Sequence, residues 1–261
     1  MYGCFVVDPE QGGDLGVVFF HNEGYSTACG HGTIALVTWA LESGRLSVTS
    51  KVDDEVEVLV DAPSGRLQTW ARVADGDVTS VRFRNVPSFV LRSAVAVEGV
   101  SVDVAFGGAF YAIAPAAAPI DREHLPELIE RGRRIKDALN RAGGVFHPLE
   151  PELRDVYGVI WTQGDRNVTV FADGQVDRSP CGSGTSARLA LLDANAKLAR
   201  GDTLRHRSIV GTVFMGRVVD DAEVAGIPAV ITEVQGSAHL TGRHEFVLEA
   251  GDPLGTGFLL R

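Results

Sequence analysis

Two short stretches of the chain carry residue types that could perform acid–base chemistry, and each is centred on a cysteine. The residues Cys29-Gly30-His31-Gly32-Thr33-Ile34-Ala35 match Cys181-Gly182-Ser183-Gly184-Thr185-Ser186-Ala187 at five of seven positions. In both cases a short strand-like segment comes first and an apolar segment with helical character follows. Each cysteine is therefore predicted to lie at the N-terminus of a helix, and the repeat indicates two similar halves with one cysteine each.

The start of a helix supplies chemistry that such a cysteine can use. The first backbone N–H groups have no partner within the helix, and the helix dipole adds positive charge there, so an anion is favoured. We expect the amides of Gly30, His31, Gly182 and Ser183 to bind a carboxylate and to stabilise negative charge that develops on it. His31 is expected to act through this amide, or as a partner of a substrate hydroxyl, rather than as a general base.

Two thiols from facing halves suit the inversion of a carbon atom that carries an acidic hydrogen. A thiol at a helix N-terminus ionises more easily than a free cysteine. One cysteine, as a thiolate, removes the proton from one face, while the other, as a thiol, supplies a proton to the opposite face. Two such groups titrate as a coupled pair that shares one proton. The predicted catalytic residues are Cys29 and Cys181, and no cofactor is needed because only a proton moves.

Other roles for these residues are a structural cysteine, a disulfide, and a metal or phosphate site. A disulfide between Cys29 and Cys181 is disfavoured in a reducing cytoplasm, and Cys4 is expected to be a small buried residue. The Cys29-x-His31 pair has no second pair with the usual spacing of zinc ligands, so no metal is predicted. Neither glycine-rich stretch matches the phosphate-binding pattern Gly-x-x-x-x-Gly-Lys-Ser/Thr.

The composition of the chain restricts its partners. Its 261 residues carry a formal net charge of −10, which argues against nucleic acid and an anionic membrane surface because both bind clustered Lys and Arg. The longest uncharged run, Val104 to Ile120, contains four Gly or Pro residues and is a poor transmembrane helix. Three cysteines and the lack of a signal-peptide pattern predict a cytoplasmic protein. The expected partner is a small molecule, and a homodimer is left open.

The elements that must position the cysteines are predicted from hydrophobic periodicity. Gly3 to Val7 and Gly16 to Phe20 are predicted to form a hairpin, and alternation from Val56 to Val86 predicts a meander of antiparallel strands. A glycine pair beside aromatic residues, from Gly107 to Ala112, indicates backbone packed close to another group, with a ligand as one candidate. An amphipathic helix is predicted from Asp121 to Ala142, just after the boundary between the halves.

The second half repeats the order of the first: strand, turn, strand, cysteine motif, helix and further strands. The later strands are predicted at Val213 to Val219, Ala229 to Val234, Phe246 to Leu248 and Gly257 to Leu260. The predicted class is α+β, with two pseudo-symmetric halves, each a curved antiparallel sheet wrapped around one apolar helix. We place the first half at residues 1–117, together with a C-terminal strand at about 250–261, and the second half at 118–249.

The longer second motif, from Asp177 to Arg188, resembles the second cysteine motif of the proline racemase family, and Cys29 to Ile34 resembles the first. Ser208 to Thr212 and Asp252 to Phe258 also resemble family stretches, so the similarity extends over nearly the whole chain. The family includes proline racemase, 4-hydroxyproline 2-epimerase and trans-3-hydroxyproline dehydratase. The resemblance implies a diaminopimelate-epimerase-like fold with the active site between the halves, and a C-terminal strand that returns to the first half.

The resemblance also implies an isomerase that acts on a cyclic imino acid. Asp177 matches the family residue that accepts from the ring ammonium, with a helix cap as its other interpretation, and Phe171 matches a residue that packs on the substrate ring. Many dehydratases of the family have Thr where this chain has Cys181, and proline racemases more often have Asn at the position of Gly32. Both differences favour the epimerisation of trans-4-hydroxy-L-proline to cis-4-hydroxy-D-proline by two cysteines.

Three alternatives stay open: a proline racemase, a lyase that dehydrates trans-3-hydroxy-L-proline with Cys29 as base, and a non-catalytic amino-acid-binding remnant. The third alternative, a non-catalytic remnant, follows from a comparison of the N-terminus with that of the family. Family members usually have several dozen residues before the match at Met1-Tyr2-Gly3, including early strands of the first half, and this chain is expected to lack them. A dehydratase would release a product that absorbs as an imine or keto acid, whereas a binding module would not exchange the Cα proton.

Overall fold

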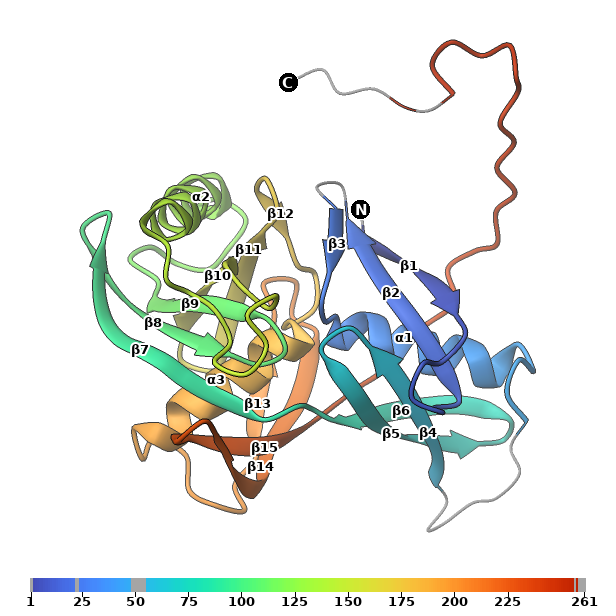
Figure 1. Ribbon diagram of the computed structural model, residues 1–261, viewed down its shortest axis with the longest axis horizontal. Coiled ribbons are helices and arrows are strands. Elements are labelled where there is room, and N and C mark those ends of the chain that lie inside the picture. Colours follow the sequence, from blue (N-terminus) through green and yellow to red (C-terminus); the bar gives the residue numbers. More distant parts are fainter. Residues whose placement is uncertain (1, 22–23, 48–54, 256, 258–261) are drawn as a thin grey trace.

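A computed structural model of the chain describes residues 2–21, 24–47, 55–255 and 257. In this part of the chain the strands form a continuous, strongly bent sheet that extends through two lobes (Figure 1). The helices are α1 (Gly30–Glu42), α2 (Leu125–Ala142) and α3 (Gly182–Ala194). The strands are β1 (Tyr2–Val7), β2 (Leu15–His21), β3 (Gly24–Ser26), β4 (Glu55–Ala62), β5 (Gly65–Ala74), β6 (Asp77–Arg84), β7 (Ser88–Val97), β8 (Val100–Phe106), β9 (Phe110–Pro115), β10 (Val156–Gln163), β11 (Arg166–Phe171), β12 (Gln175–Val176), β13 (Leu204–Arg207), β14 (Val213–Val224) and β15 (Ile227–Gly236).

The first lobe contains α1 and strands β1 to β6 (blue to teal in Figure 1). The predicted hairpin is confirmed by the antiparallel pairing of β1 with β2, and the predicted meander by that of β4, β5 and β6. Along β4, Val56, Val58 and Val60 are buried while Glu57 is exposed. The period of two therefore turns one face of the meander toward the core, where these valines join a cluster that includes Val37 of α1.

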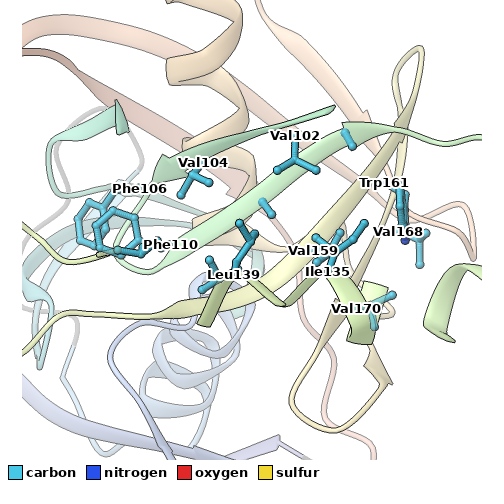
Figure 2. Close-up of a cluster of buried hydrophobic side chains, with 14 of the residues drawn as sticks. Val102, Val104, Phe106, Phe110, Ile135, Leu139, Val159, Trp161, Val168 and Val170 are labelled. Carbon is cyan, nitrogen blue, oxygen red and sulfur yellow. The ribbon is translucent and has the colours of Figure 1, made fainter. Parts of the chain in front are cut away.

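The second lobe contains α2, α3 and strands β7 to β15. Figure 2 shows its largest core cluster, in which Ile135 and Leu139 of α2 face the buried side chains of β8 to β11, among them Trp161. The helix begins at Leu125 rather than at the predicted Asp121. Asp121 instead accepts a hydrogen bond from the N–H of His124 at 3.0 Å, which forms a turn ahead of the first helical residues.

The lobes are joined by the pairing of β15 with β6, which is antiparallel. At this seam the buried Glu233 of β15 forms ion pairs with Arg84 of β6 at 2.9 Å and with Arg217 of β14 at 2.7 Å. The predicted division at residue 117 does not coincide with a break in the sheet. β9, which comes before α2 in the chain, pairs in parallel with β10, which comes after α2. Residues 88–115 therefore lie in the lobe of the second cysteine. Periodicity identifies strands but does not tell which neighbour each one takes.

The segment after β15 differs from the prediction. Residues 237–255 have no strand, so the strand expected at Phe246 to Leu248 is absent there. Residues 238–243 lie beside α1, and the chain then leads away from both lobes (Figure 1). The side chain of Phe246 is 91% exposed. An apolar, strand-forming sequence makes a stable strand only beside a partner, and this segment has none within the described residues. The last predicted strand, at 257–260, lies almost entirely outside them.

Candidate active site between two helix N-termini

The two cysteine motifs meet at the interface between the lobes, where α1 and α3 both begin. Gly30 and Gly182 are so close that a Cβ atom added to either would lie 2.4 Å from the Cα atom of the other. Only glycine fits at both positions, because any Cβ would overlap backbone atoms. The glycine that follows each cysteine thus lets the two helix N-termini touch.

The backbones of the two motifs have the same local hydrogen bonds. The Thr33 hydroxyl donates to the carbonyl oxygen of Cys29 at 2.9 Å, and the Thr185 hydroxyl donates to that of Cys181 at 2.6 Å. The N–H groups of both threonines reach the same carbonyl oxygens at 2.8 Å. The repeat in the sequence is therefore also a repeat in these hydrogen bonds of the two motifs.

The two cysteines nevertheless differ in conformation. Cys29 has an extended backbone with φ −149° and ψ 96°, and its Sγ accepts a hydrogen bond from the N–H of Gly32 at 3.3 Å. Cys181 has φ 70°, in the left-handed region. Such a conformation costs roughly 1–3 kcal/mol in a residue other than glycine and is concentrated at functional sites. The hydroxyl of Ser179 holds this turn by accepting from the N–H of Cys181 at 3.0 Å.

A small, narrow cavity lies between the motifs and includes both cysteines in its wall. Both are buried, with 4% and 5% of their surface exposed. The lining residues are Tyr2, Ala28, Cys29, Gly30, His31, Tyr111, Tyr157, Phe171, Asp177, Cys181 and Ser183. Seven of the eight predicted site residues are in this set. The eighth, Gly182, lies against Gly30.

On the side of α1, three residues form a connected chain. The Nε2 atom of His31 lies 3.4 Å from Sγ of Cys29. Its Nδ1 atom lies 3.2 Å from a carboxylate oxygen of Asp177 and 3.3 Å from the Ser179 hydroxyl. The other carboxylate oxygen of Asp177 accepts from the N–H of Ser179 at 2.8 Å. The second motif thus supplies the carboxylate that holds the histidine of the first, across the interface between the lobes.

On the side of α3, the partner of the cysteine is a tyrosine from β9. Sγ of Cys181 lies 3.5 Å from the hydroxyl of Tyr111 and donates to it. The same hydroxyl is 2.7 Å from the hydroxyl of Ser183, the residue that replaces His31 in the repeat. A charged pair on one side is therefore matched by a neutral hydrogen-bonded group on the other.

Aromatic rings close the cavity. Tyr157 of β10 stacks on Phe171 of β11, with ring centroids 5.7 Å apart and an interplanar angle of 15°. Tyr2 of β1 meets Phe171 edge-on at 5.9 Å and His31 edge-on at 5.4 Å. Such walls exclude water and leave little room around a small ring.

Burial and charge shift the titration of these groups. Burial in the first place, and the charge of the Asp177 carboxylate in the second, raise the pKa of the Cys181 thiol to about 12. This corrects the expectation that both helix-start thiols ionise easily, because desolvation outweighs the helix dipole at Cys181. Burial lowers the pKa of His31, but the negative charges of Cys29 and Asp177 outweigh it and raise that pKa well above its usual value. The pKa of Asp177 is lowered, because His31 more than offsets the effect of burial.

The sequence analysis did not identify three tyrosines of the site, Tyr2, Tyr111 and Tyr157, which lie on three different strands. Only Tyr111 had a signal, the glycine pair that precedes it. That pair packs on protein rather than on a ligand, because a Cβ on Gly107 would lie 2.3 Å from the carbonyl oxygen of Ser183. Isolated tyrosines on strands have no pattern that distinguishes a site residue from a core residue.

Within the part of the chain that the structure describes, no group of three or more His, Cys, Asp or Glu residues is arranged to hold a metal ion. Within the same residues, none of the helices has both the length and the hydropathy needed to span a membrane.

Comparisons with known proteins connect this geometry to a family. The family model described as proline racemase matches residues 1–259. The chain is 42% identical to a trans-3-hydroxy-L-proline dehydratase from Bacillus cereus and 44% identical to a 3-hydroxyproline 2-epimerase from Burkholderia multivorans. These matches cover 100% of this chain, with 81% of the first relative and 82% of the second.

A solved structure is also similar to this chain. The crystal structure of a hydroxyproline epimerase from Agrobacterium vitis, with bound trans-4-hydroxy-L-proline, superposes with a TM-score of 0.92 at 31% identity. The match covers 98% of this chain and 77% of that one. The expected α+β fold of the diaminopimelate-epimerase-like class is confirmed by this likeness, and the match of the family model over nearly the whole sequence shows that the chain belongs to the proline racemase family.

Proposed function

We propose that this chain epimerises a hydroxyproline at Cα by proton transfer between Cys29 and Cys181. The observation that carries the proposal is the placement of two thiols, each at a helix N-terminus and each from a different lobe, in the wall of one small cavity. A two-base inversion needs two proton-transfer groups on opposite sides of one carbon. A reaction that moves only protons is consistent with such a pair of thiols.

The proposed steps move one proton off the substrate and another onto it. The Cys29 thiolate takes the proton from Cα, and the electron pair of the broken C–H bond is delocalised into the substrate carboxylate. Amides at the two helix starts, including those of Gly30 and Ser183, stabilise this charge. A helix terminus favours an anion by roughly 0.3–1 kcal/mol, and by up to about 2 kcal/mol when partly buried. The Cys181 thiol then protonates Cα from the opposite face and becomes the thiolate.

The ring position of the hydroxyl is proposed from the relatives. The more similar curated relatives are named for 3-hydroxyproline, whereas the structure with bound trans-4-hydroxy-L-proline is a more distant match. We therefore place 3-hydroxyproline before 4-hydroxyproline, which the sequence alone favoured, and before proline. The stacked Tyr157 and Phe171 rings are the surface on which the pyrrolidine ring would pack.

Dehydration of trans-3-hydroxy-L-proline is the second candidate, because several of the relatives carry that name. The first step is the same removal of the Cα proton by Cys29. A hydroxyl on C3 is adjacent to Cα, so the electron pair can instead form a Cα–C3 double bond as the C3–O bond breaks. The Cys181 thiol protonates the departing hydroxide to give water, and the enamine becomes an imine. A hydroxyl on C4 is one carbon too far for this elimination.

The two candidates are separated by one set of reactions in D₂O. Trans-3-hydroxy-L-proline, trans-4-hydroxy-L-proline and L-proline would each be incubated with the protein, and the products followed by proton NMR, chiral chromatography and ultraviolet absorbance. We expect Cα deuteration with inversion of 3-hydroxyproline, and its loss in Cys29→Ser and in Cys181→Ser. Cys4→Ser is the matched control, because Cys4 is outside the cavity wall. An absorbing imine without inversion would favour the dehydratase, and a folded protein that neither exchanges the Cα proton of any of the three compounds nor forms an imine from them would refute both.

A further inference from the structure

We infer that His206 is a positioning residue for Cys181 and acts on it through the hydroxyl of Thr185. The imidazole lies within hydrogen-bond distance of that hydroxyl, which in turn donates to the carbonyl oxygen of Cys181. The kinetic consequence rests on the proposed function, since Cys181 is one of the two proposed proton-transfer groups. The chain of hydrogen bonds itself can be observed without any substrate.

The first argument is the geometry of this chain. The hydroxyl oxygen of Thr185 lies 2.6 Å from the carbonyl oxygen of Cys181 and 2.8 Å from Nδ1 of His206. A hydroxyl has one hydrogen to donate, and a carbonyl oxygen can only accept. At 2.6 Å that hydrogen lies between the two oxygen atoms, so the hydroxyl accepts from His206. The ring proton is therefore on Nδ1, and the direction of both hydrogen bonds is fixed.

The second argument is that the surroundings of the His206 ring keep it neutral. The side chain extends from β13 into the interior and is fully buried. Burial, and then the positive charge of Arg188, lower the pKa of His206 well below its usual value. A neutral ring has one N–H, and Thr185 is the acceptor that it reaches. Within the described residues Nε2 has no hydrogen-bond partner, so the contact with Thr185 is the polar contact that orients the ring.

The third argument is that the backbone at Cys181 needs support. Its φ of 70° is in the left-handed region, and such a conformation persists only where the surroundings determine it strongly. The hydroxyl of Ser179 accepts from the N–H of Cys181 at 3.0 Å, and the side-chain amide of Asn167 donates to the carbonyl oxygen of Pro180 at 2.9 Å. These contacts hold the turn on its N-terminal side. Thr185 holds the carbonyl group of Cys181 on the other side.

The fourth argument is the contrast with the first motif. The Thr33 hydroxyl donates to the carbonyl oxygen of Cys29 at 2.9 Å, and within the described residues this is its one hydrogen bond. The backbone of Cys29, with φ −149° and ψ 96°, is in the ordinary β region. The histidine is therefore added behind the threonine in the motif whose cysteine has the unfavourable backbone, and not in the other.

The hydrogen bond is tested in the wild-type protein by NMR of the ring nitrogens of ¹⁵N-labelled histidine. The signals of His206 are assigned by their absence from the spectrum of His206→Asn. We expect a neutral ring at neutral pH, with its proton on Nδ1. A ring with its proton on Nε2 would overturn the inference, because Nδ1 could not then donate to Thr185.

The positioning role is tested by the kcat and KM of the reaction that the wild-type protein catalyses on the proline substrates. The side-chain nitrogen of Asn can take the place of Nδ1, whereas that of Gln corresponds to Nε2. We expect kcat to fall about tenfold or more in His206→Gln, since misplacement of a reacting group by about 1 Å can cost about 100-fold. KM should change less, because the aromatic wall at Phe171 is untouched. His206→Asn should largely restore kcat.

A double variant shows whether His206 acts through Thr185. Thr185→Val lacks the hydroxyl, so the addition of His206→Gln should lower kcat no further, whereas independent effects would add. His147→Gln is the matched control. His147 is also buried, and its Nδ1 accepts from the N–H groups of Leu149 and Glu150, but it is outside the cavity wall. This variant should lower Tm and leave kcat unchanged.

The outcomes separate this inference from the proposed function. Equal losses of kcat in His206→Asn and His206→Gln, additive losses in the double variant, or an unchanged kcat in folded His206→Gln would overturn the positioning role. Wild-type protein with the proton on Nδ1 that converts none of the proline substrates would instead refute the proposed function, and with it the kinetic consequence, while the hydrogen-bond chain would stand.

Discussion

The contact between Gly30 and Gly182 gives the sharpest prediction about the site. In Gly30→Ala the new methyl group would lie 2.4 Å from the Cα of Gly182, whereas non-bonded carbon atoms meet at about 3.5–4.0 Å. The overlap is therefore at least about 1 Å, and it falls on backbone atoms that have no rotamer to change. The two helix starts must move apart, and the two thiols move with them.

The expected consequences follow from that displacement. Overpacking of this kind costs roughly 1–3 kcal/mol, so Tm should fall by a few degrees while the protein still folds. Misplacement of reacting groups by about 1 Å can cost about 100-fold in rate, so Cα exchange should fall by about that factor. Gly182→Ala should behave in the same way, because the contact is mutual.

The assay is Cα deuterium exchange in D₂O, with Tm from circular dichroism. Gly251→Ala is the control, because a Cβ on Gly251 meets no atom within 4 Å and its φ is not in the left-handed region. Folded Gly30→Ala protein that exchanges as fast as the wild type, with an unchanged Tm, would show that the helix starts are not in contact, and the geometric basis of the proposed mechanism would be wrong.

Two further predictions concern the side of Cys181. Tyr111→Phe removes a buried hydroxyl that forms hydrogen bonds with both Cys181 and Ser183, so it should lower the free energy of unfolding by about 1–3 kcal/mol and slow Cα exchange. Tyr25→Phe, at a ring that is 75% exposed, is the control and should change neither. An unaltered urea midpoint in Tyr111→Phe would contradict these hydrogen bonds. Because the pKa of Cys181 is raised to about 12 in the folded state, its contribution to stability is fully present below the unfolded pKa near 9 and is lost as pH rises from there towards 12. The free energy of unfolding, from urea titrations, should fall by about 1.4 kcal/mol between pH 7 and pH 10 for this group, and this part of the loss should be missing in Cys181→Ala; equal pH dependence in both proteins would refute the assignment.

The sequence by itself determined the parts of the protein that depend on local pattern. The repeated motif placed each cysteine at a helix start, because glycine, threonine and small apolar residues in that order favour such a start wherever it occurs. The alternation of Val56, Val58 and Val60 with Glu55, Glu57 and Leu59 identified a strand with one buried face. Local periodicity and helix-start chemistry need no knowledge of the rest of the chain.

Only the tertiary structure decided which residues surround the two cysteines. Tyr2, Tyr111 and Tyr157 reach the cavity because three separate strands begin beside it. The Asp177 of one motif meets the His31 of the other only across the interface between the lobes. The same holds for the contrast between the two thiols. Desolvation and neighbouring charges are set by packing between distant segments, so two nearly identical motifs can place their cysteines in different electrostatic surroundings.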